Sequence, residues 1–220
     1  MKKLEICTGY EYNEPDTIGE CIVCEVSGVS STISPEEMFD SIQGLHLPRF
    51  EELPEIDLYM DQVVALMQKY LEPLLGKGSD KAITPSMINN YVKQGAVPAP
   101  VKKRYGREHI AQLIIICIFK QILPIPSIQA IMKNYLSRCT VCQMYNRFSE
   151  TYELLGRQTV DRTRQRWDRI QRQGGSDDAA RDDLVVQMAM SASVHKILIE
   201  AFLDRMKSDA QLEHGKPEEK

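Results

Sequence analysis

The feature that most constrains the fold is one short stretch in which a capped polar helix, a proline-rich turn and a basic segment follow one another. It runs from Thr84 to His109 and reads TPSMINNYVKQGAVPAPVKKRYGREH. Thr84 and Pro85 suit a hydroxyl cap and a first-turn proline, and Gly95 suits a helix end, so we predict a helix over residues 84–95. A polar helix followed by a basic turn suits a helix that enters a nucleic-acid groove beside a wing.

Charge is distributed unevenly along the chain, and its basic part coincides with this stretch. Residues 81–120 hold seven Lys and Arg against one acid, whereas residues 1–80 hold five against sixteen. The whole chain has a net charge of -4, and residues 121–220 are close to neutral. Because basic side chains neutralise phosphates, the local excess indicates an anionic partner for a chain that is acidic overall.

The predicted helix over 84–95 has two different faces. The inward face is apolar, with residues at helical spacing: Met87, Ile88, Tyr91 and Val92. The outward face is polar: Ser86, Asn89, Asn90 and Lys93. An asparagine amide offers a donor and an acceptor to adenine in the major groove, so we predict that these four outward residues read bases. The alternative is that the two asparagines are merely solvated helix residues.

A small wing is expected after this helix. Residues 96–101 contain two prolines and suit one arm of an edge hairpin, and residues 102–105 would be the return arm. Phosphate contacts are predicted along this wing, over 100–107, and at the helix cap: Thr84, Lys102, Lys103, Arg104, Tyr105 and Arg107. For the basic cluster taken alone, the alternative is a solvated run of charges.

Hydrophobic periodicity predicts a mainly helical, all-α fold around this stretch. Helices are expected over 35–43, 57–75 and 107–123, from Ser127, over 134–155 and 159–173, and from Asp177 onwards. We therefore divide the chain into a Cys-containing extension (1–33), a winged helix-turn-helix domain (34–135), a helical region (136–210) and a disordered tail (211–220).

The last predicted helix carries a long apolar stripe. It consists of Leu184, Met188, Ser191, Val194, His195, Leu198, Phe202 and Met206. Such a stripe suits homodimerisation or sensing, and the alternative is that the helix packs back on its own domain.

Taken in order, these residues resemble the winged helix-turn-helix of the mercury-resistance-regulator (MerR) type. In that family a Ser-Pro helix start leads through a tyrosine-bearing recognition helix to Gly, two apolar residues and Pro, then to an Arg-Tyr wing and a Leu/Ile-rich helix. The matching positions are Thr84, Pro85, Tyr91, Gly95, Ala96, Val97, Pro98, Arg104, Tyr105 and Ile110. Residues 125–128 resemble the short segment that precedes the family's next helix.

More closely, residues 39–134 resemble a bacterial family of domains of unknown function related to that group, some members of which act as transcriptional repressors. The resemblance rests on ITPSMINNYVKQG and KRYGREHIAQLIIICIFKQ. It implies a double-stranded DNA partner and operator recognition by a homodimer. The chain departs from the broader family in three places: Asn89 and Asn90 replace an Arg-Tyr pair, the wing is short, and the loop over 76–83 is long.

The cysteines include two CxxC pairs, Cys21 with Cys24 and Cys139 with Cys142. Four thiolates can hold zinc or an iron–sulfur cluster, and a thiol- or metal-responsive sensor is therefore a further hypothesis. The two pairs are far apart in the sequence and fit no compact metal module, so we expect reduced thiols and no cofactor. Cys117 is expected in the core.

No catalytic constellation is apparent, because the four histidines are far apart and no Walker loop or dinucleotide fingerprint is present. His109 is expected to cap a helix or lie near a phosphate. No signal peptide or membrane span is expected, which predicts a cytoplasmic protein. The leading hypothesis is a non-enzymatic, sequence-specific transcriptional regulator with no identified effector, and the alternative is a helical protein-interaction module.

Overall fold

A computed structural model describes residues 34–44, 46–75, 83–174 and 176–214 of the protein. The predictions for residues 1–33, including Cys21 and Cys24, fall outside the described residues. Of the disordered tail predicted over 211–220, residues 211–214 are helical instead, because the last helix continues to His214, and residues 215–220 fall outside the described residues. The chain divides into two units, Met1–Ile33 and Ser34–Lys220, and every element named below belongs to the second.

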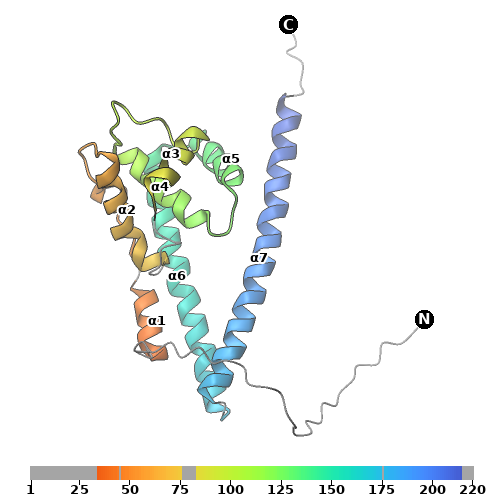
Figure 1. Ribbon diagram of the computed structural model, residues 1–220. Coiled ribbons are helices and arrows are strands. Elements are labelled where there is room, and N and C mark those ends of the chain that lie inside the picture. The colour runs from red at the N-terminus through yellow and green to blue at the C-terminus, as the bar shows by residue number, and fades with distance from the viewer. Residues whose placement is uncertain (1–33, 45, 76–82, 175, 215–220) are drawn as a thin grey trace, which may run out of the picture. The chain divides into compact units, whose positions relative to one another are not determined.

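Seven α-helices and one 3₁₀ helix make up the described part of the second unit (Figure 1). They are α1 (Pro35–Gln43), η1 (Phe50–Glu52), α2 (Met60–Leu75), α3 (Pro85–Lys93), α4 (Arg107–Phe119), α5 (Ile125–Leu136), α6 (Val141–Arg172) and α7 (Asp177–His214). The predicted all-α fold is confirmed. The only sheet-like pairings among the described residues are two isolated antiparallel bridges, Leu58 with Tyr105 and Val101 with Arg104.

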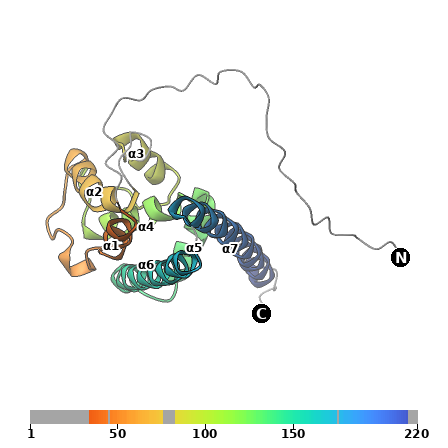
Figure 2. The same ribbon diagram turned by 90° about the horizontal axis from the view of Figure 1, so that it is seen from below.

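The central helix of the core is α4. All of its residues from Ile110 to Ile118 are buried, Gln112 included. Seen from below, α2, α3, α5 and α6 are arranged around it (Figure 2). A helix that is apolar on every side needs protein on every side, and this explains why α4 is buried.

The turn from α4 into α5 follows the prolines, although α5 begins earlier than predicted. Pro124 takes the N-cap position and Pro126 lies in the first turn. A proline there lacks an N–H that would in any case have no partner within the helix, so the helix can begin before Ser127.

A single helix of 32 residues, α6, replaces the two helices predicted over 134–155 and 159–173. It passes through Gly156, where the break was expected. A glycine in a helix interior costs only about 1 kcal/mol relative to alanine, which packing along the rest of the helix outweighs.

The predicted boundary between regions 34–135 and 136–210 does not separate two domains. α6 packs against α1, η1, α4 and α5. Met144 and Tyr145 from its first turns belong to the same core cluster as the buried residues of α4. The boundary therefore runs through one continuous core.

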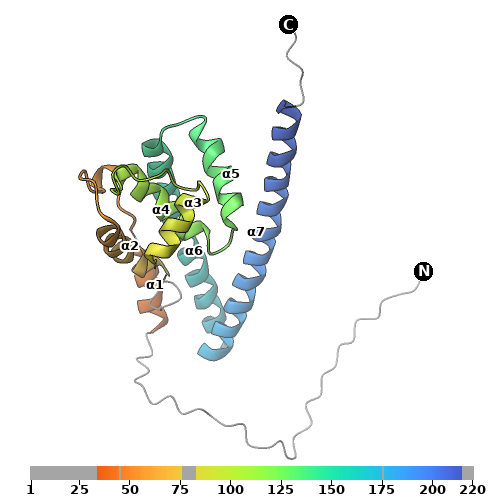
Figure 3. The same cartoon turned by 45° about the horizontal axis from the view of Figure 1, so that its top comes forward.

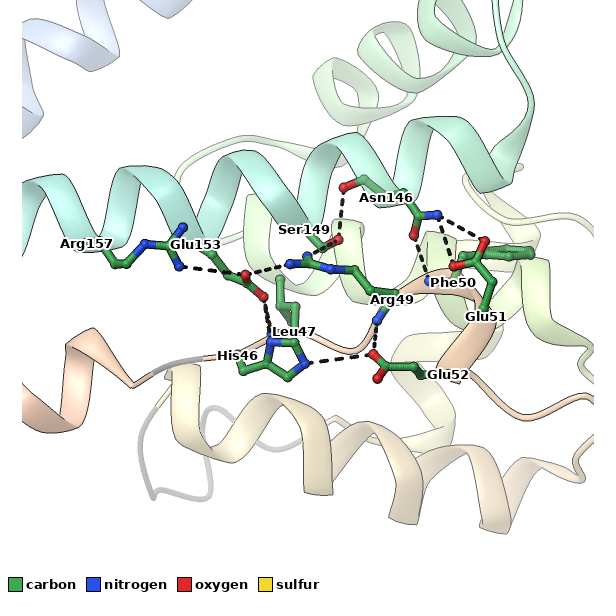
Figure 4. A network of polar contacts seen from close by, with 10 residues as sticks. All are labelled: His46, Leu47, Arg49, Phe50, Glu51, Glu52, Asn146, Ser149, Glu153 and Arg157. Carbon is green, nitrogen blue, oxygen red and sulfur yellow. Dashed lines mark hydrogen bonds and ion pairs between the residues drawn. The ribbon is translucent and has the colours of Figure 1, made fainter.

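A polar network fixes the segment before η1 to α6 (Figure 4). At its centre, the Glu153 carboxylate accepts a hydrogen bond from the Leu47 N–H at 3.1 Å and pairs with Arg49 Nη2 at 2.8 Å. His46 Nδ1 lies 2.9 Å from the same carboxylate, and Arg49 Nη1 donates to the Ser149 hydroxyl at 2.9 Å. A third residue of α6, Asn146, accepts a hydrogen bond from the Phe50 N–H at 2.7 Å.

These contacts determine the ionisation of Glu153, whose side chain is only 7% exposed. Burial alone would raise its pKa. The hydrogen bonds from Leu47 and Arg49 and the charges of Arg49 and His46 outweigh that effect and hold the pKa below its ordinary value of 4.5. Glu153 is therefore a buried carboxylate with partners on several sides.

The last helix, α7, packs back on the unit over only part of its surface. Ala180, Leu184 and Leu203 are buried. An exposed stripe runs elsewhere along the helix and consists of Val186, Met190, Val194 and Ile197, which are 52%, 64%, 56% and 62% exposed. The predicted stripe is thus divided, since Leu184 is covered whereas Met188, Leu198 and Phe202 are exposed.

No membrane span is expected from the sequence, but α7 is long and apolar enough to be a candidate for one. By length and composition, residues 177–208 form one helix that could cross a bilayer, with a mean hydropathy of 1.3 in its most apolar window. Residues 110–123, another strongly apolar segment of the chain, belong mostly to the buried helix α4.

Candidate nucleic-acid interface

The helix predicted to meet nucleic acid, α3, has the ends that the sequence indicates. The Thr84 hydroxyl accepts a hydrogen bond from the Met87 N–H at 3.3 Å. Beyond the other end, Gly95 has a φ of 72°, and the Ala96 N–H donates to the Tyr91 carbonyl at 2.8 Å. This is a Schellman arrangement, in which the residue just after the helix takes a left-handed conformation. Glycine is favoured there because it has no Cβ to oppose that conformation.

Three neighbouring helices hold α3 in place. Its inward residues Ile88 and Tyr91 are 0% and 4% exposed and lie in the core, and α3 packs against α2. Burial raises the pKa of Tyr91 to about 12. From α5, the Gln129 side-chain amide donates to the Gln94 carbonyl at the end of α3. Sequence reasoning missed Gln129, because the contact joins residues of two separate helices and has no local signal.

Just after α4, the Lys120 ammonium lies 4.0 Å from the Met87 sulfur of α3. The orientation of α3 therefore depends on α4 and α5 as well as on α2.

The outer face of α3 is open to solvent (Figure 3). It consists of the four predicted base-reading residues, all exposed: Ser86, Asn89, Asn90 and Lys93. None of these side chains has a hydrogen bond or ion pair with another described residue. Together with Met87 they line one shallow depression. The face thus combines hydroxyl, amide and ammonium groups that have no internal partner in the described part of the chain.

A basic turn, Lys102 with Lys103, lies between Val101 and Arg104. Val101 N–H donates to the Arg104 carbonyl at 3.1 Å, and Arg104 N–H donates back at 2.9 Å. Lys102 and Lys103 have φ values of 50° and 64° and are exposed. Two-residue hairpin turns with positive φ at both positions usually contain asparagine and glycine, and a lysine there costs about 1–2 kcal/mol.

The wing is smaller than predicted. Tyr105 pairs with Leu58, with N–H to carbonyl distances of 2.8 and 2.9 Å, and not with residues 96–101. Pro98 and Pro100 have no N–H to donate to a ladder, which explains why that arm does not form. The described residues therefore hold a hairpin turn without strands, and a MerR-type wing is not among them.

Tyr105 is buried, so it is not accessible for the phosphate contact that was predicted for it. Its side chain is 3% exposed, and its ring meets the His109 ring edge-on with centroids 5.6 Å apart. Burial raises the pKa of Tyr105. His109 in turn accepts a hydrogen bond from the Gly106 N–H on Nδ1 at 3.1 Å, so the predicted role of His109 as a helix cap is confirmed.

The two arginines beside the basic turn have partners within the protein. Arg104 is exposed, donates to the Tyr59 hydroxyl at 2.9 Å and lies 4.9 Å from that ring's centroid. Arg107 pairs with Glu55 at 3.2 Å and is 22% exposed. Lys102 and Lys103, by contrast, have no ion pair or hydrogen bond from their side chains within the described residues.

The cysteines that the structure describes are free thiols: Cys117, Cys139 and Cys142. Cys117 is buried, as predicted, and burial raises its pKa to about 12. The Cys142 thiol donates to the Glu51 carboxylate at 3.5 Å. No group of three or more His, Cys, Asp or Glu suited to a metal ion occurs in the described ranges, and Cys21 and Cys24 lie outside them.

Residues 48–154 match the family model DUF1836, a domain of unknown function. The match spans α2, α3, the basic turn, α4, α5 and part of α6. It bears out the resemblance to a family of unknown function, and it contains no statement of a MerR or regulator relationship. No curated protein and no solved structure matches the chain.

Proposed function

We propose that the protein is a sequence-specific DNA-binding transcriptional regulator, and that it represses its targets as a homodimer. The observation that carries the proposal is the outer face of α3, which offers exposed polar groups without internal partners in the described chain, on a helix held by its neighbours. A preorganised helix loses little conformational entropy on entering a major groove.

In this proposal the residues have two kinds of role. Ser86, Asn89, Asn90 and Lys93 contact base edges, where an asparagine can bind adenine through two hydrogen bonds. Lys102 and Lys103 contact phosphates. Their unfavourable backbone conformation supports this role, because strain of this kind tends to occur at functional sites.

Further phosphate contacts are proposed for residues at the start of α3 and beside the basic turn. Thr84 can still donate its hydroxyl hydrogen, and Arg104 is exposed while it stacks on Tyr59. Arg107 contributes mainly by long-range electrostatic attraction of the phosphates, because its guanidinium remains paired with Glu55. Tyr105 has no part in the proposal.

The proposed dimer rests on the exposed stripe of α7, and two copies of α3 in a homodimer would read a two-fold symmetric operator. A cytoplasmic location belongs to the same proposal, since the protein must reach chromosomal DNA.

A competition gel shift tests the function. The purified full chain is mixed with DNA from its own upstream region and with random competitor, at low and at physiological salt. A complex that survives competitor supports the proposal. Binding that competitor and salt abolish would leave a basic surface without sequence readout, and would contradict it.

A second candidate, a helical protein-interaction module, is favoured by the apolar residues exposed along α7. It predicts no DNA complex at either salt concentration, together with a protein that co-purifies in a stable ratio.

A further inference from the structure

An apolar pocket of about 420 Å³ opens between α4, α5 and α6. α4 contributes Ile115 and Phe119, α5 contributes Ile131 and Met132, and α6 contributes most of the remaining lining. Pockets for small organic molecules have volumes of about 300–1,000 Å³ and mostly apolar walls. The pocket therefore has the size and the lining of a small-molecule site.

Aromatic rings form one wall of the pocket. The Phe148 ring meets the Phe119 ring edge-on at 5.4 Å and stacks with the Tyr152 ring at 6.0 Å, measured between centroids. Ile115 and Met132 are 2% and 4% exposed, so this part of the lining belongs to the core. The apolar body of a ligand would be shielded from water by these side chains, which favours its binding.

Arg147 is the one charged residue that lines the pocket. It is exposed, and among the described residues it has no hydrogen bond, ion pair or ring contact, not even with Glu150 on the same helix. No acidic side chain lines the pocket. A guanidinium that has no internal partner beside an apolar wall is complementary to a carboxylate attached to an apolar body.

We propose that this pocket binds an apolar monocarboxylic acid, with its carboxylate on Arg147 and its body against Phe148. The positive charge of Arg147 favours an anionic group, and the apolar lining favours a ligand whose remaining part is apolar. Straight-chain and aromatic acids share this chemistry, and the experiment below separates them.

The pocket is connected to α3 through shared elements. α5 supplies Ile131 and Met132 to the pocket and Gln129 to the end of α3. α4 ends at Phe119 in the pocket, and the next residue, Lys120, contacts Met87 of α3. A ligand that shifts α5 or the end of α4 therefore changes how α3 is held. This coupling step rests on the proposed function, whereas binding of the acid does not.

Equilibrium dialysis of the full chain tests the binding step. Decanoate and phenylbutyrate are compared with decanol and decylamine, which keep an apolar body but lack the carboxylate. We expect one molecule of acid to bind per protomer. Whichever of decanoate and phenylbutyrate binds more tightly shows whether the natural ligand is an aliphatic or an aromatic acid. If neither carboxylate binds, or if decylamine binds as well as decanoate, the proposal is overturned.

Two variants of α6 locate the site. Arg147→Gln is expected to weaken carboxylate binding about tenfold or more and to leave decanol binding unchanged. Arg162→Gln removes an exposed arginine from the same helix outside the pocket, and it is expected to change nothing. Equal effects of the two variants would overturn the role of Arg147.

Thr151→Trp fills the pocket from an exposed position, so the core need not repack. It is expected to abolish binding of both acids and of decanol, with an unchanged unfolding temperature. If this variant instead disrupts a dimer and leaves carboxylate binding intact, the pocket is a protein interface and the proposal is wrong.

The coupling step is measured as the change in operator affinity on adding the acid that binds. We expect a change of about 5- to 150-fold, and operator DNA must change the affinity for the acid by the same factor. Acid binding without any DNA binding would overturn the proposed function alone. Specific DNA binding without acid binding would overturn the pocket proposal alone.

Discussion

Single residues join parts of the chain that are far apart in the sequence, and Glu153 is the clearest case. We predict that Glu153→Gln lowers the free energy of unfolding by about 3 kcal/mol at neutral pH, because Arg49 would no longer have its charged partner in a mostly buried position. Urea unfolding measures the decrease. Glu150→Gln, at an exposed position of the same helix, is the matched control and is expected to have little effect.

The same residue predicts how stability depends on pH. The pKa of Glu153 is lower in the folded chain than its ordinary value of 4.5. Its contribution is therefore complete above that value and is lost as the pH falls through the folded pKa. The stabilities of wild type and Glu153→Gln should converge in acid, and a constant difference at every pH would contradict this explanation.

The basic turn predicts a conflict between stability and binding. Lys102→Asn combined with Lys103→Gly places favoured residues at positive φ, so the free energy of unfolding should rise by about 1 kcal/mol. The same double variant should weaken binding to all DNA sequences alike and reduce the salt slope by about two. Lys69→Ala combined with Lys133→Ala, which removes two exposed lysines from α2 and α5, controls for net charge. A more stable variant with unchanged DNA binding would remove the turn from the interface.

At this scale the sequence predicted residues whose environment is local. Helical spacing alone indicated that Asn89 and Asn90 face outward, and they are exposed. The burial of Tyr105 depends on its pairing with Leu58, and the partners of Glu153 include Arg49. Such contacts join segments distant in sequence, and one sequence has no local signal for them.

Whole elements were predicted where end signals and periodicity agree, as in α1, α3 and α4. Ser34 accepts from the Glu37 N–H at 3.2 Å, and its own N–H donates back to the Glu37 carboxylate at 2.9 Å. The continuity of α6 could not be predicted in this way, because tertiary packing decides whether a helix continues through a glycine.

Gly156 therefore offers a test of α6. A Cβ added at Gly156 would have no heavy atom within 4 Å. Gly156→Ala is expected to raise the free energy of unfolding by about 1 kcal/mol, since alanine loses less backbone entropy in a helix. Thermal and urea unfolding measure the change. A decrease in stability would mean that α6 bends or breaks at this residue.

For the whole molecule, α7 determines how copies meet. The exposed stripe of Val186, Met190, Val194 and Ile197 has spacings of four, four and three residues, which suit pairing of two helices. We predict that Met190→Glu combined with Ile197→Glu converts a dimer to a monomer, as measured by light scattering coupled to gel filtration. Val185→Glu alters another exposed valine of α7 and should leave the dimer intact.

The same measurement separates the alternatives for this helix. A monomeric wild type would contradict dimerisation through the stripe. Wild type that requires detergent, or that partitions into lipid vesicles, would make α7 a membrane segment, as the mean hydropathy of 1.3 in its most apolar window permits.

The most direct test of the central claim is the ratio of two affinities, for an operator selected from random DNA and for a scrambled sequence. Asn89→Ala combined with Asn90→Ala should reduce this ratio. The difference between the two binding free energies should fall by about 1–3 kcal/mol for each adenine that is no longer bound by an asparagine, with little change in binding to scrambled DNA. The double variant of the basic turn should lower both affinities and keep the ratio. A wild-type ratio of one, or equal behaviour of the two double variants, would contradict sequence reading by α3.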